Sequence, residues 1–576
     1  MVSGAVTILL TDNRKLHKCT GGDAGGGLVA AASSQIRVRS AGHEPFLRIP
    51  PFPGAKLKYF SKMTSVDARS DDVAGAIRGA RVGGTYWAAR PALPAKYVLV
   101  ASASAVRMAR KIAGDRPVVL WDRHADGSSW PVDLVVRGEC DPWHMLQNAS
   151  AFVSQVRDEL RMIAGLLEVP CFDTDGACGT LVQADVEPAQ LLAEQLADTA
   201  FENPFTGEPM GPLEAIALCG FWRDLIDSNR DISGGIGFAF WKQGHVAPLL
   251  WNGSGDFNFI RSASGVDRGD AIAVWRSKAS SEAIAELESA EVRLVEVEDG
   301  FLRSRGLGAD CIPPLSLTVD RLAAYFDPAR PSEIERLLQD GNFDGQLLER
   351  ARELRRLIVE AGLGKYGQGR SHVERPAGAR RHVLVPGQVE DDRAVIEGGC
   401  GLASNLELLK RARQQAPDAY ILYKPHPDVV AGHRRGSIPQ SDCLQFADEI
   451  VGDVPISSLI DMVDEIHTNT SLAGFEALLR TKSVTTYGVP FYAGWGLTRD
   501  LGPVPARRTR TRTVDELAAA VLLLYPRYLD PITGLPCPAE VIVSRLSEPN
   551  GDDPGPIVIL RRLQGRFVRR LRSFLQ

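Results

Sequence analysis

Short apolar, β-branched runs alternate along the chain with segments of helical periodicity. The clearest example runs from "RHVLVPG" through "ASNLELLKRARQQAP" to "AYILYKPHP". Each apolar run ends in Gly, Pro or a polar turn, which is typical of a buried strand, and the segments between them favour amphipathic helices. Strands that alternate with helices in this way predict parallel α/β sheets. We therefore expect Rossmann-like domains.

The pattern predicts two facing α/β lobes in the second half of the chain. An N-lobe is expected at 231–375, with strands in "DAIAVWRSK" and "VRLVEVEDG" and a helix over 280–290. A C-lobe is expected at 376–550, and a single helix over 331–362 would join the two lobes.

The first half of the chain resembles the second. "NPFTGEPMGPLEAIAL" (203–218) matches "DPITGLPCPAEVIVSRL" (530–546) at an offset of 327. Three further pairs precede it in the same order, at offsets of 320, 302 and 285: 148–170 with 468–490, 118–126 with 420–428, and 96–107 with 381–392. Offsets that grow toward the C-terminus indicate a duplication followed by deletions in the first copy. We therefore predict a degenerate module at 36–230, preceded by an extension at 1–35.

Length and composition indicate the cellular compartment of the protein and how many hydrophobic cores it forms. At 576 residues the chain exceeds the usual domain size of about 100–200 residues, so several cores are expected. Its longest apolar run, 517–525, is shorter than the roughly 20 residues that cross a bilayer. The nine cysteines are scattered, without zinc-site spacing, which favours a reducing cytoplasm.

The charge is unevenly distributed. A net charge of -5 argues against nucleic-acid binding, yet the tail at 551–576 carries six arginines. At helical spacing Leu563, Phe567 and Leu571 share one side of this tail. Two interpretations stay open: a helix lying on a membrane surface, and a helix packed on the protein with a solvated arginine face.

Four polar segments follow predicted strands of the second copy. Open α/β sheets bind ligands at the carboxyl ends of their strands, so we expect these segments to meet. They are "VEDGFLRSRGLG" (297–308), "PGQVEDD" (386–392), "YKPHPD" (423–428) and "HTNTSLAGFEAL" (467–478).

Two of these segments predict a phosphate site. A helix that begins near Ser471 would offer free backbone N–H groups, with donors from Thr470 and close approach at Gly474. Glu476 would accept ribose hydroxyls. On this segment alone, ordinary N-capping by Ser or Thr is the more frequent explanation. The other segment places the cation of Lys424 and the imidazole of His426 beside rigid prolines, Pro425 and Pro427.

The other two segments supply acids. Glu298 and Asp299 belong to one lobe and Asp392 to the other, and such carboxylates serve as nucleophile or as general acid and base. Aspartates also bind Mg²⁺, but no DxD-type pair compels a metal site here, and a monophosphate leaving group does not need one, so no metal is expected.

Together with "TTYGVPFYAGWGLT", these segments resemble the KpsC-like β-Kdo glycosyltransferases that build the capsule linker of Gram-negative bacteria, over roughly 235–545. The resemblance implies a GT-B-like fold and transfer from CMP-Kdo to a lipid acceptor with retained configuration. It places the nucleophile motif Q-x-x-x-D on Gln388 and Asp392. The His-Pro motif falls on His426 and Pro427, and the acidic motif on Glu298, Asp299 and Gly300, with the roles of the two acids open.

The first copy departs from these motifs. Ala103 and Arg107 stand opposite Gln388 and Asp392, and His124 is followed by Ala rather than Pro. Because a guanidinium cannot act as a nucleophile, we expect this copy to be inert.

The sequence therefore predicts a cytoplasmic retaining β-Kdo transferase without a cofactor, peripheral at the inner membrane through its basic tail. Its partners would be CMP-Kdo, a lipid-linked or Kdo-terminated acceptor, and capsule assembly and export proteins. Two alternatives remain: a GT-B transferase that uses another nucleotide sugar, such as CMP-sialic acid, and a non-catalytic capsule-assembly subunit.

Overall fold

The computed structural model describes most of the chain between residues 45 and 548. The described residues are 45–63, 72–123, 130–154, 159–174, 181–183, 196, 199–304, 311–365, 367–368, 371, 373–376, 378, 380–432, 434–452 and 454–548. The predicted extension at 1–35, the basic tail at 551–576 and His124 lie outside these residues. The chain forms two compact units, 1–50 with 58–223, and 51–57 with 224–576. Their division falls within helix α6 (Pro212–Asp227), before the predicted boundary at residue 230.

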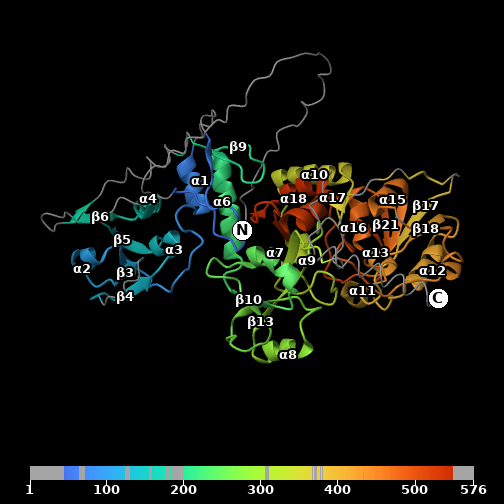
Figure 1. The fold of residues 1–576 in the computed structure, drawn as a ribbon, viewed down its shortest axis with the longest axis horizontal. Coiled ribbons are helices and arrows are strands. Elements are labelled where there is room, and N and C mark those ends of the chain that lie inside the picture. The colour runs from blue at the N-terminus through green and yellow to red at the C-terminus, as the bar shows by residue number, and fades with distance from the viewer. Residues whose placement is uncertain are drawn as a thin grey trace, which may run out of the picture. The chain divides into compact units, whose positions relative to one another are not determined.

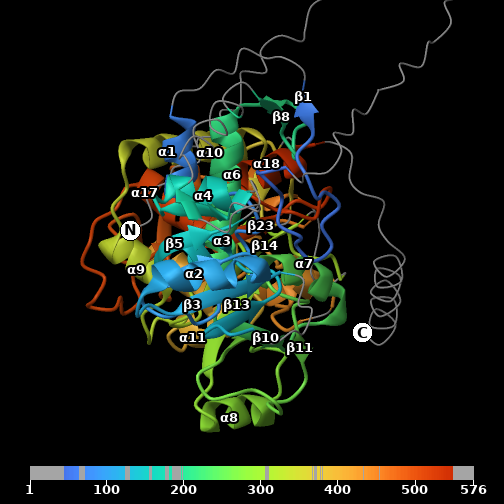
Figure 2. The ribbon, with the colours of Figure 1, turned by 90° about the vertical axis from the view of Figure 1, so that its left-hand side faces the viewer.

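The first unit contains a six-stranded sheet with the strand order β4-β3-β2-β5-β6-β7. Its strands are β2 (Tyr97–Val100), β3 (Val118–Asp122), β4 (Leu134–Arg137), β5 (Ala149–Val153), β6 (Cys171–Thr174) and β7 (Leu181–Gln183). Helix α2 (Val106–Ala113) lies against β2 and β3 (Figure 2). Val98, Val118 and Ala109 belong to the apolar core that joins the helix to these strands. This unit is the additional α/β module expected from the sequence.

The C-lobe of the second unit is a parallel sheet of order β19-β18-β17-β20-β21-β22, coloured orange in Figure 1. Its strands are β17 (His382–Pro386), β18 (Tyr420–Lys424), β19 (Glu449–Ile450), β20 (Glu465–Thr468), β21 (Ser483–Thr486) and β22 (Arg499–Asp500). Its helices include α11 (Arg393–Gly398), α12 (Asn405–Gln415), α13 (Pro427–Val430), α15 (Ile456–Met462) and α16 (Leu472–Leu479). Every residue of β17 is buried, as a strand covered on both faces requires.

The N-lobe is a seven-stranded mixed sheet of order β11-β10-β12-β13-β14-β23-β24. Its strands are β10 (Ile232–Ile236), β11 (Phe259–Ile260), β12 (Ala271–Val274), β13 (Arg293–Asp299), β14 (Ser316–Asp320), β23 (Pro526–Leu529) and β24 (Pro536–Cys537). Its helices include α7 (Phe240–Leu250) and α8 (Ser281–Ser289), the second of which confirms the helix expected over 280–290. The paired Rossmann-like lobes of a GT-B-like fold are thus present.

The predicted lobe boundary at residue 550 does not follow the sheets. Strand β23 pairs antiparallel with β14, with Leu317 opposite Arg527, and β24 pairs with β23. The last strands of the chain therefore complete the N-lobe sheet, and these red elements lie apart from the orange C-lobe (Figure 1). A Rossmann-like pattern cannot reveal this return, because strand pairing between distant segments leaves no local periodicity.

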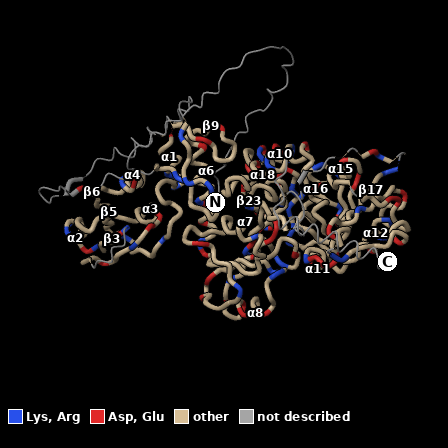
Figure 3. The backbone as a smooth tube through the Cα atoms, viewed as in Figure 1, with Lys and Arg blue, Asp and Glu red and all other residues tan. Residues whose placement is uncertain are grey.

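The single helix predicted over 331–362 is two helices, α9 (Glu333–Asp340) and α10 (Gly345–Glu360). The break occurs because Asp344 starts the second helix, accepting a hydrogen bond from the backbone N–H of Leu347 at 2.9 Å. Helix α10 contains both basic and acidic residues, coloured blue and red on the backbone in Figure 3. Arg350 of this helix pairs with Glu540, and Arg355 pairs with Asp515. Both acids lie close in sequence to β23 and β24, the strands that complete the N-lobe sheet.

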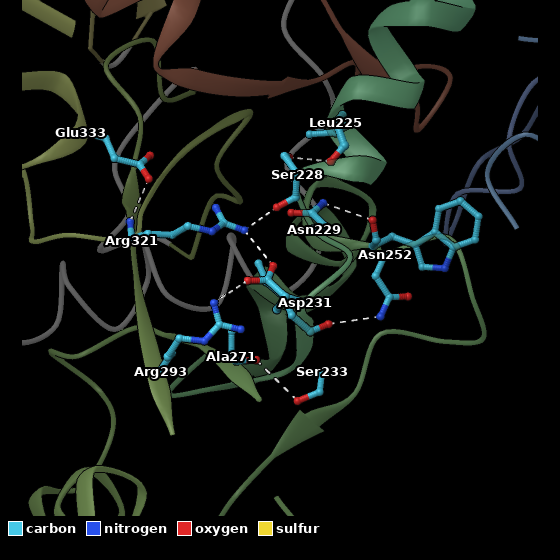
Figure 4. Close-up of polar contacts among 12 residues, drawn as sticks. Leu225, Ser228, Asn229, Asp231, Ser233, Asn252, Ala271, Arg293, Arg321 and Glu333 are labelled. Atoms are coloured by element: carbon cyan, nitrogen blue, oxygen red, sulfur yellow. Dashed lines mark hydrogen bonds and ion pairs between the residues drawn. The ribbon is translucent and has the colours of Figure 1, made fainter. Parts of the chain in front are cut away.

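A polar cluster ties together the N-lobe strands at one edge of the sheet. Asp231, just before β10, accepts from Arg321 at 3.0 Å and pairs with Arg293 at 3.1 Å (Figure 4). Burial opposes ionisation of Asp231, yet the two arginines outweigh it and lower its pKa. Arg293 begins β13 and Asp299 ends it, so the cluster lies at the edge opposite Asp299.

The repeated turn is the same in both units. Gly207 and Gly534 have φ of +76° and +71°, and their N–H groups donate to the carbonyls of Asn203 and Asp530, each at 2.9 Å. The turns lead into α6 and α18 (Ala539–Ser547), which begin 327 residues apart as predicted. The offsets of 285 and 302 also match the starts of β2 and β17 and of β3 and β18.

One predicted alignment is displaced. Strands β5 and β20 hold the same place in their sheets, yet they begin at Ala149 and Glu465, 316 residues apart rather than 320. The sequence match between 148–170 and 468–490 was made on small polar residues, so it does not coincide with the starts of the two strands.

No described helix combines the length and apolarity needed to span a bilayer.

Asp530→Ala is expected to destabilise the second unit. Asp530 is fully buried, receives two hydrogen bonds from Thr533 and one from Arg545 at 2.9 Å, and its loss leaves Arg545 without this partner. Breaking such a pair costs about 3 kcal/mol, or a melting temperature lower by about 5 °C. Asp530→Asn places the same residue as Asn203 of the first unit at this turn, and it should lower the melting temperature less than Asp530→Ala. Equal melting temperatures for wild type and both variants in a thermal scan would contradict this account.

Candidate active site

A cavity of about 490 Å³ lies within the second unit, between the two lobes. It gathers residues from all four polar segments picked out in the sequence: Glu298, Asp299, Gln388, Asp392, Lys424, His426, Pro427, Thr470, Ser471 and Glu476. Its size is in the range of cavities that hold small ligands. Gly474 is not among the lining residues, and a Cβ built there would lie 2.2 Å from Tyr492 Oη. The missing side chain at Gly474 therefore makes room for Tyr492.

Asp392 stands at the start of α11 in the C-lobe. Its Oδ1 accepts a hydrogen bond from the backbone N–H of Ala394 at 3.0 Å, and its Oδ2 lies 3.8 Å from Nη2 of Arg434. Its side chain is 48% exposed. One carboxylate oxygen is thus fixed by the helix cap, which sets the direction of the group at the cavity wall.

Gln388 joins two strand ends of the C-lobe. Its Oε1 accepts from the backbone N–H of Thr470 at 3.0 Å, and its Nε2 donates to Thr470 Oγ1 at 2.9 Å. Its backbone N–H donates to Asn405 at 2.8 Å. Gln388 therefore holds the loop after β17 against the loop after β20, so its amide positions a neighbouring lining residue.

Lys424 and His426 follow β18. Lys424 donates to the carbonyl of Gly452 at 2.7 Å. His426 Nδ1 accepts from the backbone N–H of Asp428 at 3.1 Å, which puts the proton of the neutral ring on Nε2. Burial lowers the pKa of His426, so the ring is a neutral hydrogen-bond donor near pH 7.

Helix α16 contributes Ser471 and Glu476. Ser471 Oγ caps the helix by accepting from the backbone N–H of Ala473 at 3.2 Å. Glu476 is 7% exposed, and its Oε1 accepts from the backbone N–H of Lys365 at 2.8 Å. Its Oε2 has no hydrogen-bond partner among the described residues, and burial raises its pKa. A buried polar atom of this kind is ready for a ligand hydroxyl.

The pKa values of the neighbouring acids Glu298 and Asp299 are shifted in opposite directions. Burial raises the pKa of Glu298 to about 8, although Arg393 donates to its Oε1 at 3.1 Å. Burial also disfavours the charge on Asp299, but Lys242 at 3.2 Å and Arg303 at 2.9 Å outweigh it and lower the pKa to about 2. Glu298 therefore exchanges a proton near neutral pH, whereas Asp299 remains an ionised partner of two cations.

Four cations of the site were missed in the sequence: Lys365 and Arg434 line the cavity, and Arg393 and Lys242 contact its acids. Arg393 directly follows Asp392, and this adjacency was the available signal; its guanidinium also lies 5.0 Å from the ring of Phe326. Lys242 lies on α7, far in sequence from every motif, and its Nζ sits 3.3 Å from the centre of the Trp275 ring. No local pattern marks it.

Comparison with known proteins gives the family. Residues 270–355 and 346–528 match the family described as capsule polysaccharide biosynthesis protein. The capsule polysaccharide modification protein LipA of Neisseria meningitidis serogroup A is 40% identical over 366 residues, which are 62% of this chain and 52% of LipA. The chain is similar to this capsule polysaccharide biosynthesis family over residues 270–528. The KpsC-like resemblance is thereby confirmed.

Other capsule family relatives cover different shares of the chain. The lipopolysaccharide-processing protein LpsZ of Rhizobium meliloti is 45% identical over 267 residues, 45% of this chain and 60% of LpsZ. A solved structure described as Thermosulfurimonas dismutans KpsC, beta Kdo 2,4 transferase is 32% identical. It covers 55% of this chain and 98% of that one, with a TM-score of 0.47. The chain spans about half the length of the LipA proteins that it matches.

Gln388→Leu is expected to loosen the loop after β20, because it removes both hydrogen bonds to Thr470 and leaves that buried amide unpaired. Hydrogen–deuterium exchange of peptides that contain Thr470 should speed up by about tenfold. Gln388→Glu, which keeps the acceptor for the amide, is the control and should exchange more slowly than the Leu variant. Unchanged exchange in the Leu variant would disprove the positioning role.

Proposed function

We propose that this chain is a retaining β-Kdo glycosyltransferase of capsule linker biosynthesis, which moves Kdo from CMP-Kdo to a lipid-linked or Kdo-terminated acceptor. The observation that carries the proposal is the convergence of Asp392 from one lobe and Glu298 from the other on a single cavity. Similarity to the capsule polysaccharide biosynthesis family and the motif resemblance support Kdo as the transferred sugar.

The C-lobe is assigned to the CMP moiety. The start of α16 at Ser471 presents backbone N–H groups and the positive end of the helix dipole to the phosphate. Lys424 adds a cation and His426 a neutral donor through Nε2. Glu476 offers its unpartnered Oε2 to the ribose hydroxyls. These groups bind CMP as a leaving group, so the same contacts stabilise the charge that develops when it departs.

The first step is attack of an Asp392 oxygen on C2 of Kdo. A new C2–O bond forms to Asp392 while the C2–O bond to the phosphate breaks, and CMP leaves with the electron pair. The product is a sugar ester of Asp392 with inverted configuration.

The second step is attack of the acceptor hydroxyl on the same carbon. Glu298 in its ionised form takes the hydroxyl proton as the bond to the acceptor oxygen forms, and the Asp392 carboxylate leaves. Two inversions give net retention. Asp299 is unsuited to this role because Lys242 and Arg303 hold it as a weakly basic carboxylate.

A lipid-linked acceptor would place the protein at the cytoplasmic face of the inner membrane, where the basic tail at 551–576 would contact anionic headgroups. In this proposal the first unit supports the second and has no transferase activity of its own, since Arg107 takes the place of the nucleophile. Capsule assembly and export proteins complete the proposed partners, and no cofactor or metal is required.

Asp392→Asn is expected to retain CMP binding and to lower turnover below about a hundredth of wild type, because the attacking charge is lost with little change in volume. Release of CMP or UDP is followed with CMP-Kdo, CMP-sialic acid and UDP-sugars as separate donors. Without acceptor, the intact mass of the wild type should rise by one Kdo residue. Arg107→Ala in the first unit is the control and should turn over normally. Turnover by Asp392→Asn above about a hundredth of wild type would overturn the nucleophile assignment.

The acceptor step should depend on the ionisation of Glu298. Since its pKa is raised to about 8, the fraction able to take a proton falls tenfold for each pH unit below that value. With saturating donor and limiting acceptor, the transfer rate of the wild type should rise from pH 6 to pH 8 and then level off. Glu298→Gln should be slow and nearly independent of pH. A flat profile in the wild type from pH 6 to pH 9 would rule out this role.

A further inference from the structure

Arg434 is a cation of the cavity wall to which neither the sequence nor the proposed mechanism gives a role. It lies beyond α13 in the C-lobe, with its side chain 38% exposed. Its Nη2 is 3.8 Å from Asp392 Oδ2, and its Nε donates to Asp391 Oδ1 at 3.3 Å. Among the described residues that line the cavity, Arg434 is the cation whose contact with the Asp392 carboxylate the structure shows.

Lys424, another cation of the cavity wall, donates to the carbonyl of Gly452. Lys424 thus belongs with the CMP groups at the end of β18, whereas Arg434 lies at the nucleophile.

The chemistry of the donor creates a conflict of charge at Asp392. Kdo carries a carboxylate on C2, the same carbon that the nucleophile attacks. The attacking oxygen must come within about 3–3.5 Å of C2, which brings two carboxylates side by side in a partly desolvated cavity. Like charges in such a place repel each other strongly unless a cation contacts both.

We propose that Arg434 binds the carboxylate on the anomeric carbon of the donor sugar and thereby selects nucleotide sugars that carry this group. This inference rests on the proposed function. The planar guanidinium has five N–H donors, so it can face Asp392 and hold a second carboxylate through two parallel hydrogen bonds. Asp391 holds the guanidinium from the other side.

The same arrangement serves both chemical steps. When Asp392 becomes an ester its negative charge disappears, and the guanidinium still has the sugar carboxylate as a partner. When the acceptor displaces the ester, the charge returns to Asp392 next to the same cation. A neutral aldose at this place would leave no second anion for Arg434.

The experiment measures binding in a protein that cannot turn over. In the Asp392→Asn background, the dissociation constants of CMP-Kdo and of CMP are measured by calorimetry with and without Arg434→Gln. The Arg434 change should weaken CMP-Kdo binding by about 10- to 100-fold, the usual effect of losing a charged hydrogen bond, and leave CMP binding unchanged. Arg434→Lys should weaken CMP-Kdo binding less than Arg434→Gln, because lysine keeps the positive charge but lacks the paired N–H donors of the guanidinium.

Arg435→Gln is the matched control. It removes the same charge from the neighbouring exposed residue, which does not line the cavity, and should change neither affinity. Equal weakening of CMP and CMP-Kdo by Arg434→Gln, or no weakening of either, would overturn the assignment.

The outcomes separate this inference from the proposed function. If the wild type turns over CMP-Kdo while Arg434→Gln binds it as tightly as before, the Arg434 assignment is wrong and the transferase proposal stands. If the wild type instead uses CMP-sialic acid, the proposed donor is wrong. Since that sugar also carries a carboxylate on its anomeric carbon, the same measurement with CMP-sialic acid then decides the role of Arg434.

Discussion

The ion pair between Arg393 and Glu298 is the contact on which the arrangement of the site depends. Arg393 directly follows Asp392 at the start of α11, and Glu298 lies at the end of β13 in the other lobe, so this side chain links the two lobes next to two residues of the cavity wall. Its Nη1 also lies 3.6 Å from Glu296, and its Nε donates to Glu397 at 2.8 Å. A guanidinium held by glutamates of both lobes fixes the start of α11, and with it Asp392, relative to Glu298, which two lobes joined by loops would otherwise leave variable.

The contact with Arg393 is also one reason why the pKa values of the adjacent acids Glu298 and Asp299 differ. Glu298 has one cross-lobe arginine, which burial outweighs, whereas Asp299 has Lys242 and Arg303 from its own lobe. Moving one residue along a strand turns the side chain to the opposite face, so neighbours in sequence meet different surroundings. The site thus obtains a proton-transferring group and a fixed anion from a single dipeptide.

The sequence was informative wherever the relevant property is local. Strands, helix starts and the polar strand ends follow from periodicity and capping, and parallel sheets bring strand ends together, so ten of the expected side chains share one cavity. Properties that depend on distant pairing were not predictable. The return of Arg527 beside Leu317, the cation Lys242 under Asp299 and the choice between Glu298 and Asp299 arise from contacts that no window of sequence contains. Gly474 shows the same limit, because its neighbour Tyr492 lies outside the motif.

Comparing the two copies shows which features the fold itself requires. Both keep the sheet order of the first five strands, and both keep the turn in which a glycine with positive φ closes on Asn203 or Asp530. Residues after the strands differ between the copies, such as Arg107 opposite Asp392. Core and turn residues are needed for the chain to fold, so they persist in the first copy, for which we propose no transferase activity. Strand-end side chains contribute little to stability, and losing their function removes the constraint on them. The pattern of loss is therefore itself an argument that the strand ends of the second copy are where the chemistry takes place.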